Sequence, residues 1–222
     1  MLRQETSAAI LMQTHPDSAA AEAYRTLRIN IDFAIAERGI KTIAVTSVQQ
    51  DEGKTTTALN LAVAYARAGK KVLLVDADFR KPAVHRAFGN SNGFGLADGL
   101  IRQRPLDGLI QASGIDNLSI ITTGPAPSSP SEMLASDKLD ELLAELKRGY
   151  DMVLIDTPPS LGLIDAKIVA SKCDGVLLVV EYRKVKRAAA KRVKDELTNV
   201  KAHVLGVVFN KINSKDAEAY YY

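Results

Sequence analysis

Short runs of Val, Ile and Leu recur along the chain, separated by amphipathic or alanine-rich stretches. The runs cover residues 41–46, 71–75, 118–122, 152–155, 175–180 and 203–209. Apolar residues follow one another within a run instead of alternating with polar ones, which is typical of strands covered on both faces. Strands of this kind alternating with helices predict an α/β fold, a doubly wound and mostly parallel sheet flanked by helices on both faces.

Helix signals mark the stretches between the runs. A first helix is expected to begin at Asp17 or Ser18, either of which is able to cap it, and to end near Glu37. The segment Ser129-Pro130-Ser131-Glu132 resembles a capping box with proline in the first helical position. It predicts another helix that reaches about Lys147.

Length and composition indicate one ordinary domain. The 222 residues should form a single domain, with 1–16 as an N-terminal arm and 211–222 as a C-terminal tail. Hydrophobic residues make up 46% and charged residues 25%, and the apolar runs are far shorter than the ~20 residues that span a bilayer. A single cysteine, Cys173, excludes an internal disulfide and fits a reducing compartment, so we expect a cytoplasmic protein.

Charge adds one local feature. The formal net charge of +3 is too small to indicate nucleic acid, and no nucleic-acid partner is expected. Seven basic residues nevertheless fall between Arg183 and Lys194. Val185, Val193 and Leu197 are interleaved at helical spacing, so the ordinary interpretation is a buried stripe with a solvated basic face. The alternative is a docking surface for an acidic partner, for example phosphorylated tails.

A phosphate-binding loop is predicted after the first strand. The segment Asp51-Glu52-Gly53-Lys54-Thr55-Thr56 lies between that strand and an alanine-rich helix expected over residues 54–68. The usual phosphate-binding loop of P-loop NTPases has the pattern G-x-x-x-x-G-K-[ST], and Val48 replaces its first glycine here. Backbone N–H groups and the helix N-terminus bind phosphates whatever the side chains are. We assign Lys54 to the β- and γ-phosphates of ATP and Thr55 to Mg²⁺, while Asp51 and Glu52 are tolerated only if their carboxylates point away.

Three aspartates follow other predicted strands. Asp76 and Asp78 come after the run at 71–75, and Asp156 ends the run at 152–155. Because ligands bind at the carboxyl ends of parallel strands, these side chains should gather with the loop at one edge of the sheet. Close carboxylates repel unless a cation lies between them, and Mg²⁺ supplies one. One that is not saturated by metal is able to accept a hydroxyl proton.

These motifs together resemble those of the bacterial protein tyrosine kinases of capsule and exopolysaccharide assembly, in the form of a cytoplasmic kinase subunit. The resemblance extends from Glu22 to the C-terminus and rests on the following segments: Glu22-Ala23-Tyr24-Arg25-Thr26-Leu27-Arg28, Asp51-Glu52-Gly53-Lys54-Thr55, Leu74-Val75-Asp76-Ala77-Asp78-Phe79-Arg80-Lys81-Pro82, Thr123-Gly124-Pro125, Pro130-Ser131-Glu132, Ile155-Asp156-Thr157-Pro158-Pro159 and Tyr220-Tyr221-Tyr222.

The resemblance assigns roles within the site. It implies a catalytic set of Lys54, Asp76, Asp78 and Asp156, with Thr55 and the three aspartates as magnesium ligands. Asp78 is the favoured acceptor of the tyrosine proton, although the sequence does not separate it from Asp76. Asn210, just after the last strand, is a further candidate that would face the adenine.

The resemblance also implies substrates and partners. Tyr220, Tyr221 and Tyr222 would be autophosphorylated in trans within a ring-shaped homo-oligomer, and Glu22, Arg25 and Arg28 would lie at the subunit boundary. As an alternative, Glu22 and Arg25 are an ordinary i,i+3 surface pair. A separate transmembrane activator would hold the kinase at the inner face of the cell membrane. A cognate phosphotyrosine phosphatase and other protein substrates are further expected partners.

Two other functions stay open. The first is a partition or septum-placement ATPase, whose loop carries a signature lysine where this chain has Gln49. The second is a nucleotide-sensing adaptor in which ATP only sets the oligomeric state.

Overall fold

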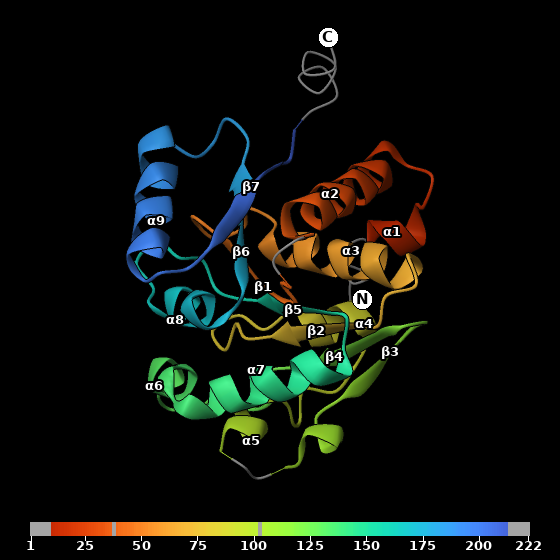
Figure 1. The fold of residues 1–222 in the computed structure, drawn as a ribbon, viewed down its shortest axis with the longest axis vertical. Coiled ribbons are helices and arrows are strands. Elements are labelled where there is room, and N and C mark those ends of the chain that lie inside the picture. Colours follow the sequence, from red (N-terminus) through yellow and green to blue (C-terminus); the bar gives the residue numbers. More distant parts are fainter. Residues whose placement is uncertain (1–9, 37–38, 102–103, 213–222) are drawn as a thin grey trace, which may run out of the picture.

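A seven-stranded sheet forms the centre of the part of the chain that the computed structural model describes, residues 10–36, 39–101 and 104–212 (Figure 1). Its strand order is β3-β4-β2-β5-β1-β6-β7, and every neighbouring pair is parallel except β3 and β4. The strands are β1 (Thr42–Ser47), β2 (Val72–Asp76), β3 (Gln111–Ile115), β4 (Leu118–Ile121), β5 (Met152–Asp156), β6 (Gly175–Glu181) and β7 (Val204–Asn210). The expected doubly wound, mostly parallel sheet is confirmed.

Helices cover both faces of the sheet (Figure 1). One face packs against α1 (Leu11–Thr14), α2 (Ala19–Ile35), α3 (Lys54–Arg67) and α4 (Val84–Phe88). The other packs against α5 (Leu96–Leu100), α6 (Pro130–Ala135), α7 (Asp137–Gly149), α8 (Asp165–Lys172) and α9 (Arg187–Asn199), with a 3-10 turn at Leu106–Gly108. Strand β2 serves both layers, because Leu73 and Leu74 belong to the opposite cores. Its continuous apolar run therefore reflects burial on both faces.

Helix α2 begins as the sequence indicates. The Ser18 hydroxyl accepts a 3.2 Å hydrogen bond from the Ala21 N–H and so caps the helix. Part of the expected N-terminal arm is also ordered against the core, because the Met12 N–H donates to the Asn60 side-chain oxygen at 2.9 Å. Within the described residues, no helix is long and apolar enough to cross a membrane.

Two expectations about the middle of the chain are wrong. Ser129 is the N-cap of α6 but makes no side-chain capping bond, so the capping box does not form, although Pro130 does occupy the first turn. The single helix expected as far as Lys147 is divided at Ser136, whose backbone is extended and whose hydroxyl bonds the Met133 carbonyl. Strand β3, which no pattern predicted, is short, polar and at the sheet edge.

Strand register places the acidic residues together. Asp76 at the end of β2 is the direct neighbour of Asp156 at the end of β5. Strand β1 lies on the other side of β5, with Val45 opposite Asp156, and it leads into the loop before α3. Three central strands therefore deliver the loop and both carboxylates to one edge of the sheet.

Replacing Leu73 with alanine should destabilise the fold strongly. Its side chain is fully buried in the core, so truncation leaves a cavity and should lower the free energy of unfolding by about 2–5 kcal/mol in urea titration. Ile164, which is 58% exposed, supplies the control: Ile164→Ala should change stability by no more than about 0.5 kcal/mol. Equal losses in the two variants would contradict the packing described here.

Candidate active site

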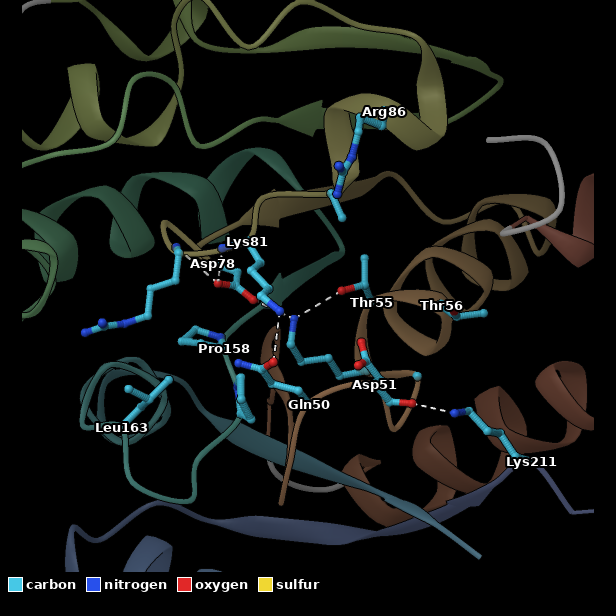
Figure 2. A pocket seen from close by; sticks show the side chains of 15 residues that line it. Gln50, Asp51, Thr55, Thr56, Asp78, Lys81, Arg86, Pro158, Leu163 and Lys211 are labelled. Carbon is cyan, nitrogen blue, oxygen red and sulfur yellow. Dashed lines mark hydrogen bonds and ion pairs between the residues drawn. The ribbon is translucent and has the colours of Figure 1, made fainter. Parts of the chain in front are cut away.

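A cavity of about 370 Å³ opens at the carboxyl edge of the sheet, where the predicted loop meets the ends of β2 and β5 (Figure 2). Its walls are formed by Gln50, Asp51, Gly53, Lys54, Thr55, Thr56, Asp78, Arg80, Lys81, Ala83, Arg86, Pro158, Pro159, Leu163 and Lys211. Most of the nucleotide-site residues expected from the sequence therefore surround one space.

Lys54 joins the loop to two of the aspartates. Its Nζ lies 2.8 Å from Asp78 Oδ2 and 3.5 Å from Asp156 Oδ2, and its side chain is only 12% exposed. Burial alone would lower the pKa of Lys54, but Asp156 and Asp78 outweigh it and raise the pKa above its ordinary value. The Thr55 hydroxyl donates to Asp156 Oδ2 at 2.6 Å. Lys54 is therefore a fixed cation beside the cavity.

The two acidic residues of the loop, Asp51 and Glu52, lie in different surroundings. Glu52 is buried, and its Oε2 accepts a 2.9 Å hydrogen bond from the Val48 N–H. Burial raises the pKa of Glu52, although the N–H groups of Gln49 and Val48 oppose that rise. Asp51 is exposed. The Glu52 carboxylate thus fixes the loop from its buried side, through the N–H of Val48, the residue that replaces the first glycine of the usual motif.

Asn210 supports the same loop from β7. Its Nδ2 donates to the Glu52 carbonyl at 2.9 Å. Gly53 has a φ of 90°, which favours glycine, and a Cβ there would lie 2.0 Å from that nitrogen, so a larger residue would also displace the Asn210 amide. The side chain of Asn210 is used on the loop, and its contact with adenine stays a prediction.

Asp76 and Asp78 have different surroundings. Asp76 accepts three backbone hydrogen bonds of 3.0 Å, from the N–H groups of Asp78, Ala83 and Val84. Burial, and then the charge of Asp156, raise its pKa to about 7. Asp78 accepts from the N–H groups of Arg80 and Lys81 through one oxygen and meets Lys54 through the other. Of these two residues, Asp78 lines the cavity.

The oxygen atoms of Thr55 and Asp156 suit a magnesium ion that is bound together with a nucleotide. Asp156 Oδ1 is buried and has no hydrogen-bond partner among the described residues, which leaves an acceptor available beside the Thr55 hydroxyl. No group of three or more acidic, histidine or cysteine side chains within those residues is arranged to hold a metal by itself. The geometry therefore fits an ion that takes few protein ligands and completes its shell with phosphate and water, as Mg²⁺ does.

Two basic residues of the cavity wall, Arg80 and Lys211, make contacts that were not expected from the sequence. Arg80 Nε lies 2.7 Å from Asp165 Oδ2, and the Ser131 hydroxyl donates to Asp165 Oδ1 at 2.5 Å. Burial opposes ionisation of Asp165, but the bonds from Arg80 and Ser131 hold its pKa below the ordinary value. Lys211 Nζ donates to the Asp51 carbonyl, and both residues line the cavity (Figure 2). Arg80 belongs to the quoted motif, whereas nothing in the sequence points to Asp165.

The expected interface and substrate residues lie elsewhere. Glu22, Arg25 and Arg28 are on α2, where Arg25 pairs with Glu22 at 2.6 Å and Arg28 with Asp32 at 2.8 Å. Both pairs lie within α2, and the role of these residues in an interface stays a prediction. Tyr220, Tyr221 and Tyr222 fall outside the described residues.

Asp76 should make the stability of the metal-free protein depend on pH. A raised pKa means that the folded state binds the proton more tightly, so the penalty is absent below about pH 4 and complete above about pH 7. The free energy of unfolding should fall on the order of 2–4 kcal/mol across that window. Asp76→Asn should flatten the dependence, and Asp116→Asn on the surface should not. The pH slope is the readout, because the amide keeps only one acceptor oxygen. An unchanged slope in Asp76→Asn would contradict the assignment.

Comparisons with known proteins agree with this geometry. The family described as AAA domain matches residues 40–206. The tyrosine-protein kinase YwqD of Bacillus subtilis (strain 168) is 43% identical over 214 residues, which cover 96% of this chain and 90% of YwqD. The kinase domain of Escherichia coli tyrosine kinase ETK is similar in structure, with a TM-score of 0.87 and 31% identity, over 92% of this chain and 82% of that chain.

A more distant neighbour shows how widely the fold is shared. The septum site-determining protein MinD from Pyrococcus horikoshii, solved with Mg-ADP, has a TM-score of 0.68 and 26% identity, over 81% of this chain and 76% of that chain. The kinases match more closely in sequence and structure and over more of the chain. The chain therefore belongs to the AAA-domain proteins and, within them, to the family of bacterial tyrosine-protein kinases.

Proposed function

We propose that this chain uses MgATP to phosphorylate the tyrosines at the C-terminus of a neighbouring copy, Tyr220, Tyr221 and Tyr222. The observation that carries the proposal is the buried Lys54 between Asp78 and Asp156 beside a cavity large enough to admit phosphates. Phosphoryl transfer needs positioning and charge neutralisation more than covalent chemistry, and this arrangement provides both.

Each residue around the phosphates has a separable role. Lys54 would contact β- and γ-phosphate oxygens, and the loop N–H groups from Gly53 to Thr56 at the start of α3 would bind the same charge. Thr55 and Asp156 would hold the metal, which neutralises phosphate charge when bound. Asp76 is anchored by three N–H groups and would orient this set from below.

Asp78 is the better candidate for the proton acceptor. It lines the cavity, whereas Asp76 is fully buried and does not line it. In the proposed step the phenol oxygen bonds to the γ-phosphorus, its proton passes to Asp78, and the bond to the bridging oxygen breaks to leave ADP. Lys54 Nζ lies 2.8 Å from Asp78 Oδ2, and Lys54 would stay charged throughout.

Transfer between copies is supported by one face of α2. Ile29 and Phe33 are 42% and 79% exposed and follow Glu22 and Arg25 at helical spacing. Large apolar side chains beside an ion pair are typical of a surface that another protein covers. Lys211, next to the last described residue, lines the cavity, and residues 211–222 would span about 40 Å if extended. We propose that this segment enters the cavity of a neighbour in a ring and not the chain's own.

The family also supports a cellular role. We propose that the kinase regulates capsule or exopolysaccharide synthesis and that a separate transmembrane protein stimulates it from the inner face of the membrane. A cognate phosphatase would then remove the phosphates, and further protein substrates would be modified by the same site.

Mixing two complementary variants, one without kinase activity and one without acceptor tyrosines, tests transfer in trans. Lys54→Met should lose at least 100-fold in kinase activity, because the phosphates lose their buried cation, but it keeps its tyrosines. A variant with Tyr220, Tyr221 and Tyr222 changed to Phe keeps its cavity but has no acceptors. Incubated together with MgATP and an activator fragment, the Lys54→Met protein should gain phosphate, as mass spectrometry of the tail would show. Phosphorylation of wild-type protein without transfer in the mixture would contradict the trans mechanism.

Changes on α2 test the assembly. Phe33→Ser, and separately alanine at Glu22, Arg25 and Arg28, should reduce the solution mass to that of smaller species in light scattering. The matched control is Arg192→Ala, which removes an exposed i,i+4 ion pair on α9 and should leave the mass unchanged. An assembly that survives both changes on α2 would show that this helix does not form the interface.

A further inference from the structure

The N-terminal part of α9 and the turn before it are strongly basic. Between residues 183 and 194 the chain has seven cations and no acidic residue. Val193 and Leu197 are the buried residues of the helix and pack on the sheet. Arg187, Lys191 and Lys194 are spaced four and three apart, so they share the exposed face. With the preceding Lys186 they are called the α9 basic surface below.

Electrostatics makes this surface unfavourable by itself. The N-terminus of a helix carries partial positive charge, which favours anions. Here Lys186 is the N-cap, Arg187 is the first helical residue, and the first turn has no acidic residue. Ion pairs on α9 involve Arg192 and Glu196. Within residues 10–36, 39–101 and 104–212, no carboxylate forms an ion pair with the four cations of the α9 basic surface.

The C-terminal segment leaves the fold beside this surface. The Tyr182 N–H donates to the Asn210 carbonyl at 2.9 Å, which ties the end of β7 to the turn that leads into α9. On the same side, Glu181 accepts from Lys184 at 3.1 Å and from Lys211 at 3.0 Å. Figure 1 shows β7 running next to β6 and α9. Asn210, two residues before Ile212, therefore lies beside Tyr182, which precedes Lys186 at the start of the α9 basic surface by four residues.

Length and charge fit this segment as the partner. Tyr220 follows Ile212 by 8 residues, a reach of about 27 Å, while the 13 residues of α9 extend about 20 Å. Without modification, residues 213–222 contain one lysine and two acidic side chains. Three phosphotyrosines would add roughly five negative charges at neutral pH. The segment would thus become strongly complementary to α9 only after phosphorylation.

We propose that the α9 basic surface binds the phosphorylated C-terminal segment, residues 213–222, and keeps the product away from the active site. This inference rests on the proposed function, because it concerns the fate of the autophosphorylated tyrosines. Lys186, Arg187, Lys191 and Lys194 provide the charge-assisted hydrogen bonds to phosphate. An anionic lipid surface fits less well, because the apolar face of α9 is already buried on the sheet and interfacial helices need that face for the membrane.

Binding of a synthetic peptide tests the inference independently of kinase activity. The probe is a fluorescent peptide of residues 211–222 with three phosphotyrosines, and the protein is the full chain with its own three tail tyrosines changed to Phe. Saturating MgADP is present so that the cavity does not compete. Anisotropy should show binding that weakens with salt and is at least tenfold tighter than that of the unphosphorylated peptide.

Charge removal identifies the surface. The variant Lys186→Gln/Arg187→Gln/Lys191→Gln/Lys194→Gln should bind the phosphopeptide at least tenfold more weakly. The matched control, Arg67→Gln/Lys70→Gln/Lys71→Gln/Arg148→Gln, removes four exposed cations from other elements and should change affinity less than twofold. Circular dichroism shows whether both variants fold. Equal affinity in the two variants would overturn the inference.

The remaining outcomes separate this inference from its rivals. If phosphatidylglycerol vesicles bind the chain through these four cations while the phosphopeptide does not, the surface faces a membrane and the inference is wrong. A chain that autophosphorylates but binds the phosphopeptide equally with and without the four cations contradicts the inference alone. A chain whose four cations bind the phosphopeptide but that forms no phosphotyrosine contradicts the proposed function instead, and with it the role given to this surface.

Discussion

The site depends on the contact of one buried lysine with carboxylates that would otherwise repel. Asp76 and Asp156 are neighbours at the ends of β2 and β5, and both are fully buried. Removing two acidic groups from water is costly unless a cation or hydrogen bonds compensate. Lys54 meets Asp78 and Asp156, and backbone N–H groups meet Asp76. The same compensation that makes this edge of the sheet tolerable leaves a cation where a phosphate would enter.

The sheet order makes that compensation possible. β2, β5 and β1 are adjacent at the centre, so two acidic strand ends and the loop before α3 converge although they are far apart in sequence. Glu52 then fixes the loop from inside, and Asn210 fixes it from β7. A site built this way is rigid below the phosphates, while its substrate segment lies outside the described residues. The proposal adds to this fixed floor an acceptor tyrosine from another copy.

Sequence patterns predicted the centre of this structure well and its margins poorly. Buried parallel strands have continuous apolar runs, so β1, β2 and β5 and the carboxylates at their ends could be placed together before any coordinates. Strand β3 was missed because it is short, polar and held by pairing with β4. The break at Ser136 and the bond of Arg80 to Asp165, 85 residues away, depend on tertiary contacts that local patterns do not contain. Glu52 was expected only to point away from phosphate, and its role in holding Val48 required the structure.

The central claim is that this cleft transfers the phosphoryl group to tyrosine. A partition-type ATPase would transfer it to water. The most direct measurement counts, in one reaction with MgATP and an activator fragment, the ATP consumed, the phosphotyrosine formed and the free phosphate released. The account predicts phosphotyrosine equal to the ATP consumed, rising to at most three per chain and then stopping as the three tail tyrosines are used. Steady release of free phosphate without phosphotyrosine would contradict it.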